Sequence, residues 1–188
     1  YIIAHGVFSW VPPAVQQALL DVCRTRLTPQ GLAYVSFNVS AGWHKLLPLR
    51  QALLASTDPQ LPAPQRVQQA YAVLNRLETE SSDPLLLQEI RYLKTAAPPY
   101  LFHEFLAEHN APMTFADFGQ QLRDAGLQYV ADAGPRRAVV AIDNADALTP
   151  ASLMRRWMDA EMSLDEALQT RFRRALLSRD DAPPAQPP

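Results

Sequence analysis

Two short segments of the chain carry the residue types that could bind a ligand, and each follows an apolar run typical of a strand. The first segment spans residues 5–10 (HGVFSW) and the second spans residues 38–44 (NVSAGWH). Each combines polar groups, a glycine and a tryptophan. Ligands of open α/β sheets bind beyond the carboxyl ends of the strands. On neighbouring strands the two segments would form one aromatic-lined pocket rim; alternatively, Trp10 and Trp43 pack over the edge of the sheet.

The remaining polar residues do not complete a recognised catalytic or metal-binding motif. The six glycines are too scattered to cradle a phosphate, and Ser36 and Ser40 lack the GxSxG context of a hydrolase nucleophile. The pair His103-Glu104 lacks the second histidine of HExxH. The single cysteine, Cys23, excludes a site made of several cysteines. We therefore expect no metal ion, and no catalytic residue is assigned.

The two loops require strands that flank a helix, and residues 1–39 have this pattern. An apolar run at 1–4 and a run rich in β-forming residues at 32–39 enclose a segment with apolar residues at helical spacing. Pro12 and Pro13 suit the start of that helix. An apolar second strand after a helix is typical of a parallel sheet, so residues 1–39 are predicted to form a strand–helix–strand unit.

Residues 40–110 show no strand pattern. Their amphipathic segments, separated by prolines, predict a helical region. Residues 111–147 then predict a helix that ends at a glycine, followed by two short strands at 127–131 and 138–142. These strands are expected to return to the sheet formed by the first part of the chain.

Residues 148–179 are expected to be helical, because Ser163 and Glu166 have the spacing of a capping box and Phe172 continues the apolar face. Residues 180–188 are rich in proline and predict a disordered tail or linker. The sequence therefore indicates an α/β fold that is predominantly helical.

The composition narrows the classes of partner. The 188 residues have a formal net charge of −2, without the basic excess of nucleic-acid-binding proteins. No run of about 18 apolar residues is present that could span a membrane. The single cysteine is typical of a cytoplasmic protein. We therefore expect a cytoplasmic location and no nucleic-acid or membrane partner. The chain opens at Tyr1 on a strand-like run, so we expect it to be a fragment of a longer protein.

Several segments resemble a group of bacterial class I S-adenosylmethionine-dependent methyltransferases with a predicted methyltransferase regulatory domain. The layout is also similar to that of rickettsial protein-lysine methyltransferases. The resemblance covers most of residues 1–177. Its most specific motifs are residues 1–12 (YIIAHGVFSWVP) and 100–106 (YLFHEFL), and the others are residues 20–38, 42–44 (GWH), 110–115 (NAPMTF) and 172–177 (FRRALL).

The resemblance implies that residues 1–39 are the C-terminal part of a Rossmann-like methyltransferase sheet, and that residues 40–110 are a helical regulatory or lid region. It implies S-adenosylmethionine as cofactor and a protein side chain as methyl acceptor. By the same resemblance the cofactor-binding residues are His5, Gly6 and Phe8. The implied substrate-binding residues are Trp10, Asn38, Trp43, His103 and Glu104. Rings such as Phe8, Trp10 and Trp43 could hold a sulfonium or an ammonium by cation–π contact.

The family's cofactor glycines and ribose carboxylate lie before the equivalent of Tyr1. The 188-residue chain by itself is therefore expected to be inactive and to bind the cofactor weakly. An exposed apolar patch near Ile2, Ile3 and Val35 would fit a sheet that continues into further strands. Two other interpretations stay open, namely a non-catalytic regulatory or substrate-recruiting helical module and a truncated product without independent function. The alternative for His103 and Glu104 is an interhelical hydrogen bond, and the alternative for His5 is a bond to backbone at a strand end.

Overall fold

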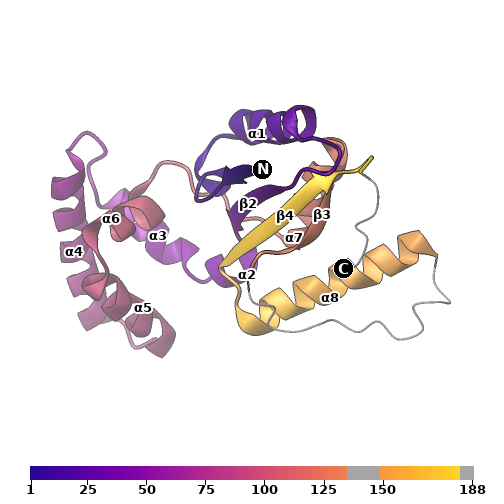
Figure 1. Ribbon diagram of the computed structural model, residues 1–188. Helices are drawn as coiled ribbons and strands as arrows, with labels where there is room; N and C mark the ends of the chain where they lie inside the picture. Colours follow the sequence, from indigo (N-terminus) through magenta and orange to yellow (C-terminus); the bar gives the residue numbers. More distant parts are fainter. Residues whose placement is uncertain (135–148, 183–188) are drawn as a thin grey trace. The chain divides into compact units, whose positions relative to one another are not determined.

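A four-stranded mixed sheet forms the centre of the larger part of the molecule. The computed structural model describes residues 1–134 and 149–182. The first two strands run parallel, and the fourth runs antiparallel to both of its neighbours (Figure 1). The order across the sheet is β1 (Ile2–Ala4), β2 (Ala33–Asn38), β4 (Phe172–Arg179) and β3 (Leu127–Asp132).

Helix α1 (Pro13–Arg26) joins the two parallel strands. Pro13 occupies the first turn, where a missing N–H costs nothing. Leu20 and Cys23 are fully buried and pack in the same core as the sheet residues. The strand, helix and strand predicted for residues 1–39 are therefore all present, and the parallel pairing of the strands is confirmed.

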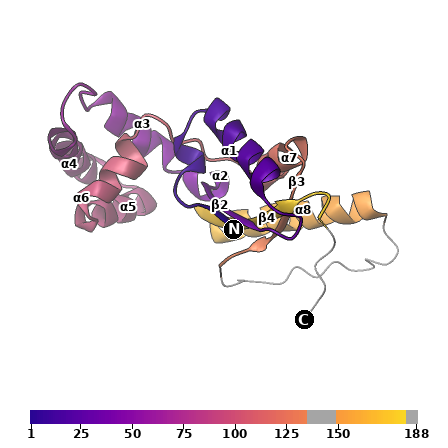
Figure 2. The same cartoon turned by 45° about the horizontal axis from the view of Figure 1, so that its top comes forward.

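One face of the sheet carries the hydrophobic core. Val35 of β2 pairs with Ala175 of β4, and both residues are fully buried. Figures 1 and 2 show α1 and α7 (Phe115–Asp124) packed against the strands. Phe118 of α7 stacks on Phe37 with ring centroids 4.1 Å apart and meets Phe8 edge-on at 5.5 Å. This aromatic cluster joins the helix layer to β2 and to the short 3₁₀ turn η1 (Phe8–Trp10).

The C-terminal part differs from its prediction. Helix α8 (Pro150–Leu168) runs through the proposed capping box without a break, and Gln169 ends it with a left-handed φ of 49°. Residues 172–179 then form β4, so the helix predicted there is wrong. Pairing with a strand on each side satisfies the backbone of β4 and overrides the local helical spacing. The strand candidate at 138–142 and residues 183–188 of the predicted tail lie outside the described residues.

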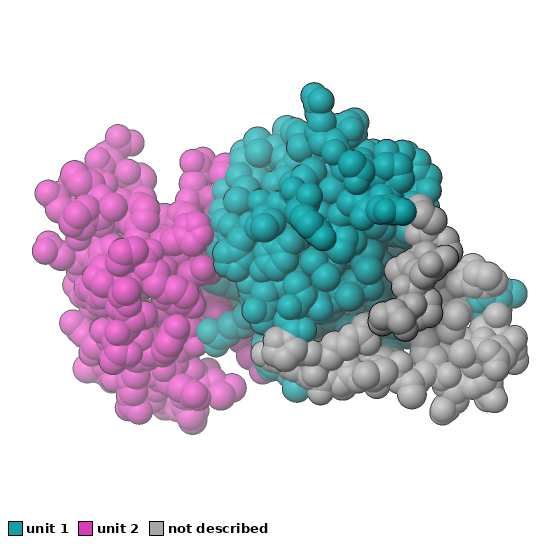
Figure 3. Space-filling view, viewed as in Figure 1, with its two compact units in different colours: residues 1–43, 111–188 teal, residues 44–110 magenta. Residues whose placement is uncertain are grey.

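Residues 44–110 form a second compact unit that consists of helices (Figure 3). The helical region was expected over 40–110. The second helix of this unit, α4 (Ala63–Glu80), has its buried positions at Val67, Ala70, Val73 and Leu74. Asp83 accepts hydrogen bonds from the first turn of α5 (Pro84–Thr95), as an aspartate at this position favours. The elements are α3 (Leu47–Ala55), α4 (Ala63–Glu80), α5 (Pro84–Thr95), α6 (Pro98–Leu101) and the π-helical turn η2 (Phe102–Leu106).

Two arginines of this helical unit bind the end of η2. Arg50 of α3 donates to the carbonyl of Ala107, and Arg66 of α4 donates to the carbonyl of Leu106 at 2.9 Å. The Arg66 guanidinium also lies over the ring of Phe102, 5.3 Å from its centroid. Cations are favourable partners for the free carbonyls at a helix end, so these arginines stabilise the turn that carries His103 and Glu104.

Gly42 lies in the short helix α2 (Ser40–Trp43), where it meets the chain that leads into β4. Its N–H donates to the carbonyl of Thr170 at 2.9 Å. A Cβ atom here would lie 2.5 Å from the Gln169 carbonyl oxygen and 2.7 Å from the Thr170 carbonyl carbon. Backbone atoms at that distance cannot move aside without disturbing the end of α8, so only glycine fits.

We expect Gly42→Ala to lower the free energy of unfolding by about 1–3 kcal/mol, because the added methyl overpacks against backbone. Gly119→Ala is the matched control. At Gly119 the nearest atom to an added Cβ is the flexible Met158 Cε at 3.3 Å, and alanine favours the helix. Urea denaturation of both variants measures the difference. Equal stability of Gly42→Ala and the parent chain would contradict the close approach.

Candidate functional site

The end of β1 leads into an exposed turn at His5 and Gly6. The His5 Nδ1 atom lies 2.9 Å from the Tyr34 hydroxyl of β2, and its ring meets Phe172 of β4 edge-on at 5.7 Å. Gly6 has a φ of +66°, and its N–H donates to the Ser36 Oγ atom at 2.8 Å. A Cβ at Gly6 would meet nothing within 4 Å, so the space beside this backbone is open.

The ends of β1 and β2 are tied together by hydrogen bonds. The Asn38 N–H donates to the Ser9 Oγ atom at 2.8 Å, and the Asn38 carbonyl accepts from the Met113 N–H at 3.0 Å. The structure therefore brings together the two loops predicted to be neighbours. Ser9 accepts from Asn38 and Ser36 accepts from Gly6, although the sequence assigned no binding role to Ser9 and Ser36 was considered only as a hydrolase nucleophile. Single serines carry no sequence signal, because their role depends on which backbone N–H lies opposite.

The aromatic residues of the two loops differ in exposure. Phe8 is fully buried and Trp43 is 3% exposed, whereas Trp10 is half-buried. A buried ring has no open face for a cation, so the structure favours packing for Phe8 and Trp43. The phenol of Tyr34 has a raised pKa, because it is partly desolvated and Asp132 adds to the shift while Arg174 opposes it. It therefore stays protonated as the partner of His5.

His103 and Glu104 lie in η2 of the helical unit. His103 is exposed and Glu104 is half-buried, and the Glu104 carbonyl accepts from the Asn110 side chain at 3.1 Å. The other six predicted site residues belong to the unit that contains the sheet. The structure therefore does not bring all eight together within one compact unit, and their binding roles stay predictions.

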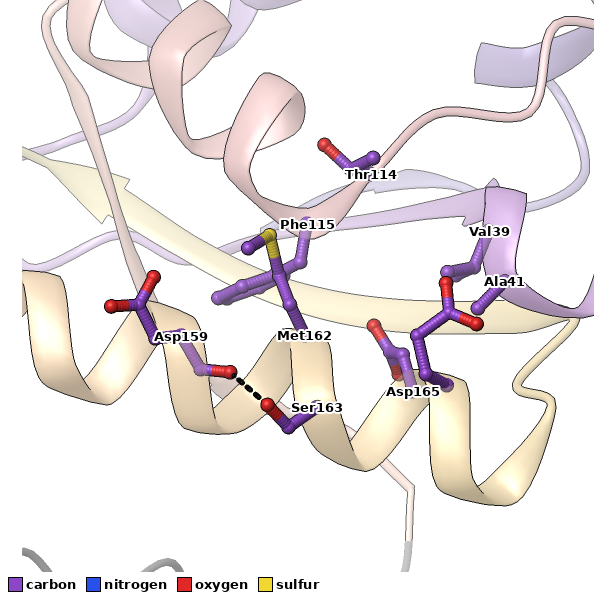
Figure 4. A pocket seen from close by; sticks show the side chains of 9 residues that line it. Val39, Ala41, Thr114, Phe115, Asp159, Met162, Ser163 and Asp165 are labelled. Atoms are coloured by element: carbon purple, nitrogen blue, oxygen red, sulfur yellow. Dashed lines mark hydrogen bonds between the residues drawn. The ribbon is translucent and has the colours of Figure 1, made fainter.

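A pocket of about 400 Å³ lies beside α8, in the unit that contains the sheet (Figure 4). Its residues come from three distant parts of the sequence, so no local pattern could have predicted it. The first part follows β2, the second begins α7, and the third is the last half of α8. The lining residues are Val39, Ala41, Thr114, Phe115, Asp159, Met162, Ser163, Asp165 and Glu166.

Asp165, which lines this pocket, and Glu161 of α8 both bind Arg173 of β4. The Arg173 Nε donates to Asp165 at 3.0 Å and its Nη2 donates to Glu161 at 2.7 Å. The guanidinium also lies 4.3 Å from the centroid of the Phe115 ring. Burial lowers the pKa of Arg173, but the two carboxylates raise it by more. Burial raises the pKa of Asp165, and the hydrogen bond from Arg173 opposes that shift only in part.

Residues 1–134 and 149–182 contain neither a membrane-spanning helix nor a metal-binding cluster. No helix in these ranges has both the length and the apolar character needed to cross a membrane. Nor do these ranges contain a group of three or more His, Cys, Asp or Glu side chains placed to hold a metal ion.

Parts of this chain are similar in sequence to a protein family and to two rickettsial proteins. Residues 97–179 match the family model described as "Predicted methyltransferase regulatory domain". The uncharacterized protein RP789 of Rickettsia prowazekii is 29% identical over 187 residues, which are 96% of this chain and 34% of that protein. RP028 of the same organism is 31% identical over 124 residues, or 63% of this chain and 50% of the relative. The chain thus spans between a third and a half of the length of these relatives.

Solved structures of PKMT2 from Rickettsia typhi resemble the whole chain. One has 26% sequence identity and a TM-score of 0.75. The matched region is 97% of this chain and 36% of the PKMT2 chain. A second, of PKMT2 in complex with AdoHcy, has a TM-score of 0.74 with the same identity and coverage. The family match over residues 97–179 and this structural similarity together support a methyltransferase-like family for the chain.

Proposed function

We propose that this chain forms the end of the catalytic fold of an S-adenosylmethionine-dependent methyltransferase together with its regulatory domain. The observation that carries the proposal is the similarity to PKMT2 in complex with AdoHcy, which extends over 97% of the chain. The match of residues 97–179 to a predicted methyltransferase regulatory domain supports the second part of the proposal. The methyl acceptor in this proposal is a protein side chain.

The edge of the sheet at β1 supports a continuation of the catalytic fold. Among the described residues, β1 pairs with β2 alone. Ile3 of this edge strand is 75% exposed, and Ile2 is half-buried. Val35, which was expected in the same exposed patch, is fully buried and belongs to the core. A free edge with an exposed apolar side chain is suited to pairing with another strand, so we propose that further strands of the fold bind there.

The residues at the end of β1 fit a place at the edge of the cofactor site. His5 is exposed and the backbone at Gly6 is open, so these two residues could contact S-adenosylmethionine, whereas the buried ring of Phe8 could not. The bound cofactor would supply an electrophilic methyl group on its sulfonium. The Ser36 hydroxyl would fix the Gly6 backbone, and Tyr34 would orient the His5 ring. Such fixed geometry is what a transfer reaction requires of the protein.

A non-catalytic role is the second candidate function. Residues 44–110 form a compact helical unit of their own, as is expected of a regulatory or substrate-recruiting module. His103 and Glu104 would then serve recognition of a protein partner by this unit. The two candidates differ in whether the chain contributes to a cofactor site.

The test is calorimetric titration of AdoHcy into the 188-residue chain and into a chimera. In the chimera, this chain replaces the matching 36% of Rickettsia typhi PKMT2. We expect the chimera to bind AdoHcy with micromolar affinity and the chain alone to bind it more weakly than that. The His5→Ala chimera should bind AdoHcy at least about tenfold more weakly than the parent chimera, because it loses a cofactor contact. His109→Ala, at an exposed histidine of the helical unit, is the control.

Circular dichroism and a single size-exclusion peak establish that each protein is folded. A folded chimera that does not bind AdoHcy would refute the catalytic proposal and leave the regulatory module. Micromolar binding by the 188-residue chain itself would show that its cofactor site is more complete than its sequence suggests.

A further inference from the structure

The pocket beside α8 has the form of a small ligand site rather than of a packing defect. Its volume of about 400 Å³ lies at the lower end of the range for binding pockets. Val39, Ala41 and Phe115 on its walls are each at most 4% exposed, so they are fixed by the core. Met162 of α8 extends toward Phe115 and completes an apolar floor (Figure 4).

Carboxylates of α8 surround the apolar floor. Asp159, Ser163 and Glu166 follow at helical spacing, so they lie on one side of α8. The Ser163 hydroxyl donates to the Asp159 carbonyl at 2.8 Å and leaves the Asp159 carboxylate to other partners. Among residues 1–134 and 149–182, neither Asp159 nor Glu166 forms an ion pair, whereas Asp165 is neutralised by Arg173. Two exposed negative charges are therefore uncompensated beside an apolar cavity.

We propose that this pocket binds the side chain of a lysine or arginine from a protein partner. Such side chains have an apolar stem that packs on hydrophobic surface and a cation that stays near water. The stem would contact Phe115 and Met162, and the cation would lie between Asp159 and Glu166. An anionic ligand would be repelled by both carboxylates. A purely apolar ligand would desolvate them without a compensating charge, which is costly.

The inference goes beyond the proposed function and does not depend on it. Every residue it uses lies in the unit that contains the sheet, and none is among the predicted cofactor- or substrate-binding residues. A titration without cofactor therefore tests the pocket separately, since failure of AdoHcy binding by the chimera would leave its result unchanged.

The test is a nuclear magnetic resonance titration of the methyl-labelled 188-residue chain. The probes are Nα-acetyl-lysine N-methylamide and its norleucine counterpart, which has a similar stem without the charge. We expect the lysine probe to shift the methyl signals of Met162, Val39 and Ala41 and to bind about fivefold more tightly than norleucine, as two exposed charge contacts allow. This preference is expected to fall in 1 M salt, where the Debye length is about 3 Å.

The variant Asp159→Asn/Glu166→Gln keeps the shape of both side chains and removes both charges. It should bind the two probes equally, whereas the control Asp21→Asn/Glu80→Gln, at exposed carboxylates outside the pocket, should keep the preference. Equal binding of the probes by the parent chain, or shifts confined to other methyl groups, would overturn the inference. Tighter binding of spermidine than of the lysine probe would overturn the assignment to a protein side chain.

Discussion

Replacement of Arg173 by methionine is expected to lower the free energy of unfolding by about 3–5 kcal/mol, because it leaves two carboxylates at a buried position without their cation. Arg173 and Asp165 have side chains that are 5% and 6% exposed, and Glu161 is 15% exposed. Water therefore cannot replace the lost partner. The ring of Phe115 would also lose the guanidinium that lies 4.3 Å from its centroid. Urea denaturation at pH 7 measures the effect.

Arg174→Met on the same strand is the matched control, because Arg174 is exposed and its loss should cost no more than about 0.5 kcal/mol. The loss caused by Arg173→Met should shrink as the pH falls. Burial already raises the pKa of Asp165, and removal of Arg173 takes away the interaction that opposes this rise. A carboxyl whose pKa is raised by folding favours the folded state at low pH and loses that contribution as the pH rises. An equal loss at pH 7 and pH 4 would contradict this account.

Replacement of Phe118 by alanine is expected to cost about 3–5 kcal/mol, the range for deletion of a fully buried phenylalanine. Phe118 is fully buried and makes ring contacts with both Phe37 and Phe8. Its loss would open a cavity where α7 meets β2 and η1. The backbone of each element is held by its own hydrogen bonds, so the surroundings can close the cavity only in part.

Thermal and urea denaturation of Phe118→Ala and Phe118→Leu give the size of this effect, and the leucine variant should lose less because it fills part of the space. Gln120→Ala, on the exposed side of the same helix, should change stability by no more than about 0.5 kcal/mol. If Phe118→Ala matched Gln120→Ala, the aromatic cluster would not be the contact that joins α7 to the sheet.

Local signals in the sequence predicted the elements whose own residues decide their structure. The apolar runs before and after α1 gave β1 and β2 correctly, and their parallel pairing followed from the helix between them. Asp83 and Thr114 are of residue types that favour helix starts, and each side chain accepts a hydrogen bond from the first turn of its helix. In each case the deciding contacts lie within a few residues of the signal.

The strand β4 was missed because two spacings compete in its sequence. Phe172, Ala175 and Leu176 fit one face of a helix, whereas Arg173, Ala175 and Leu177 fit the inward face of a strand. An arginine in the inward series conceals the strand pattern. Arg173 is tolerated there only because Asp165 and Glu161 of α8 bind it, and no local pattern shows that contact. The pocket beside α8 was missed for the same reason, since its walls meet only in the folded chain.

The helical unit interrupts the chain between two segments that belong to one sheet. Residues 1–43, 111–134 and 149–182 contribute to a single core, and β2 pairs with β4, which lies more than 130 residues later in the chain. An unfolded insertion would make that pairing slow, because closing a long flexible loop costs entropy. If residues 44–110 fold first, the loop becomes much shorter, and the bridge between Val39 and Met113 can form next to its ends. The insertion then acts as an intramolecular folding aid, and its stability would set the rate at which the sheet is completed.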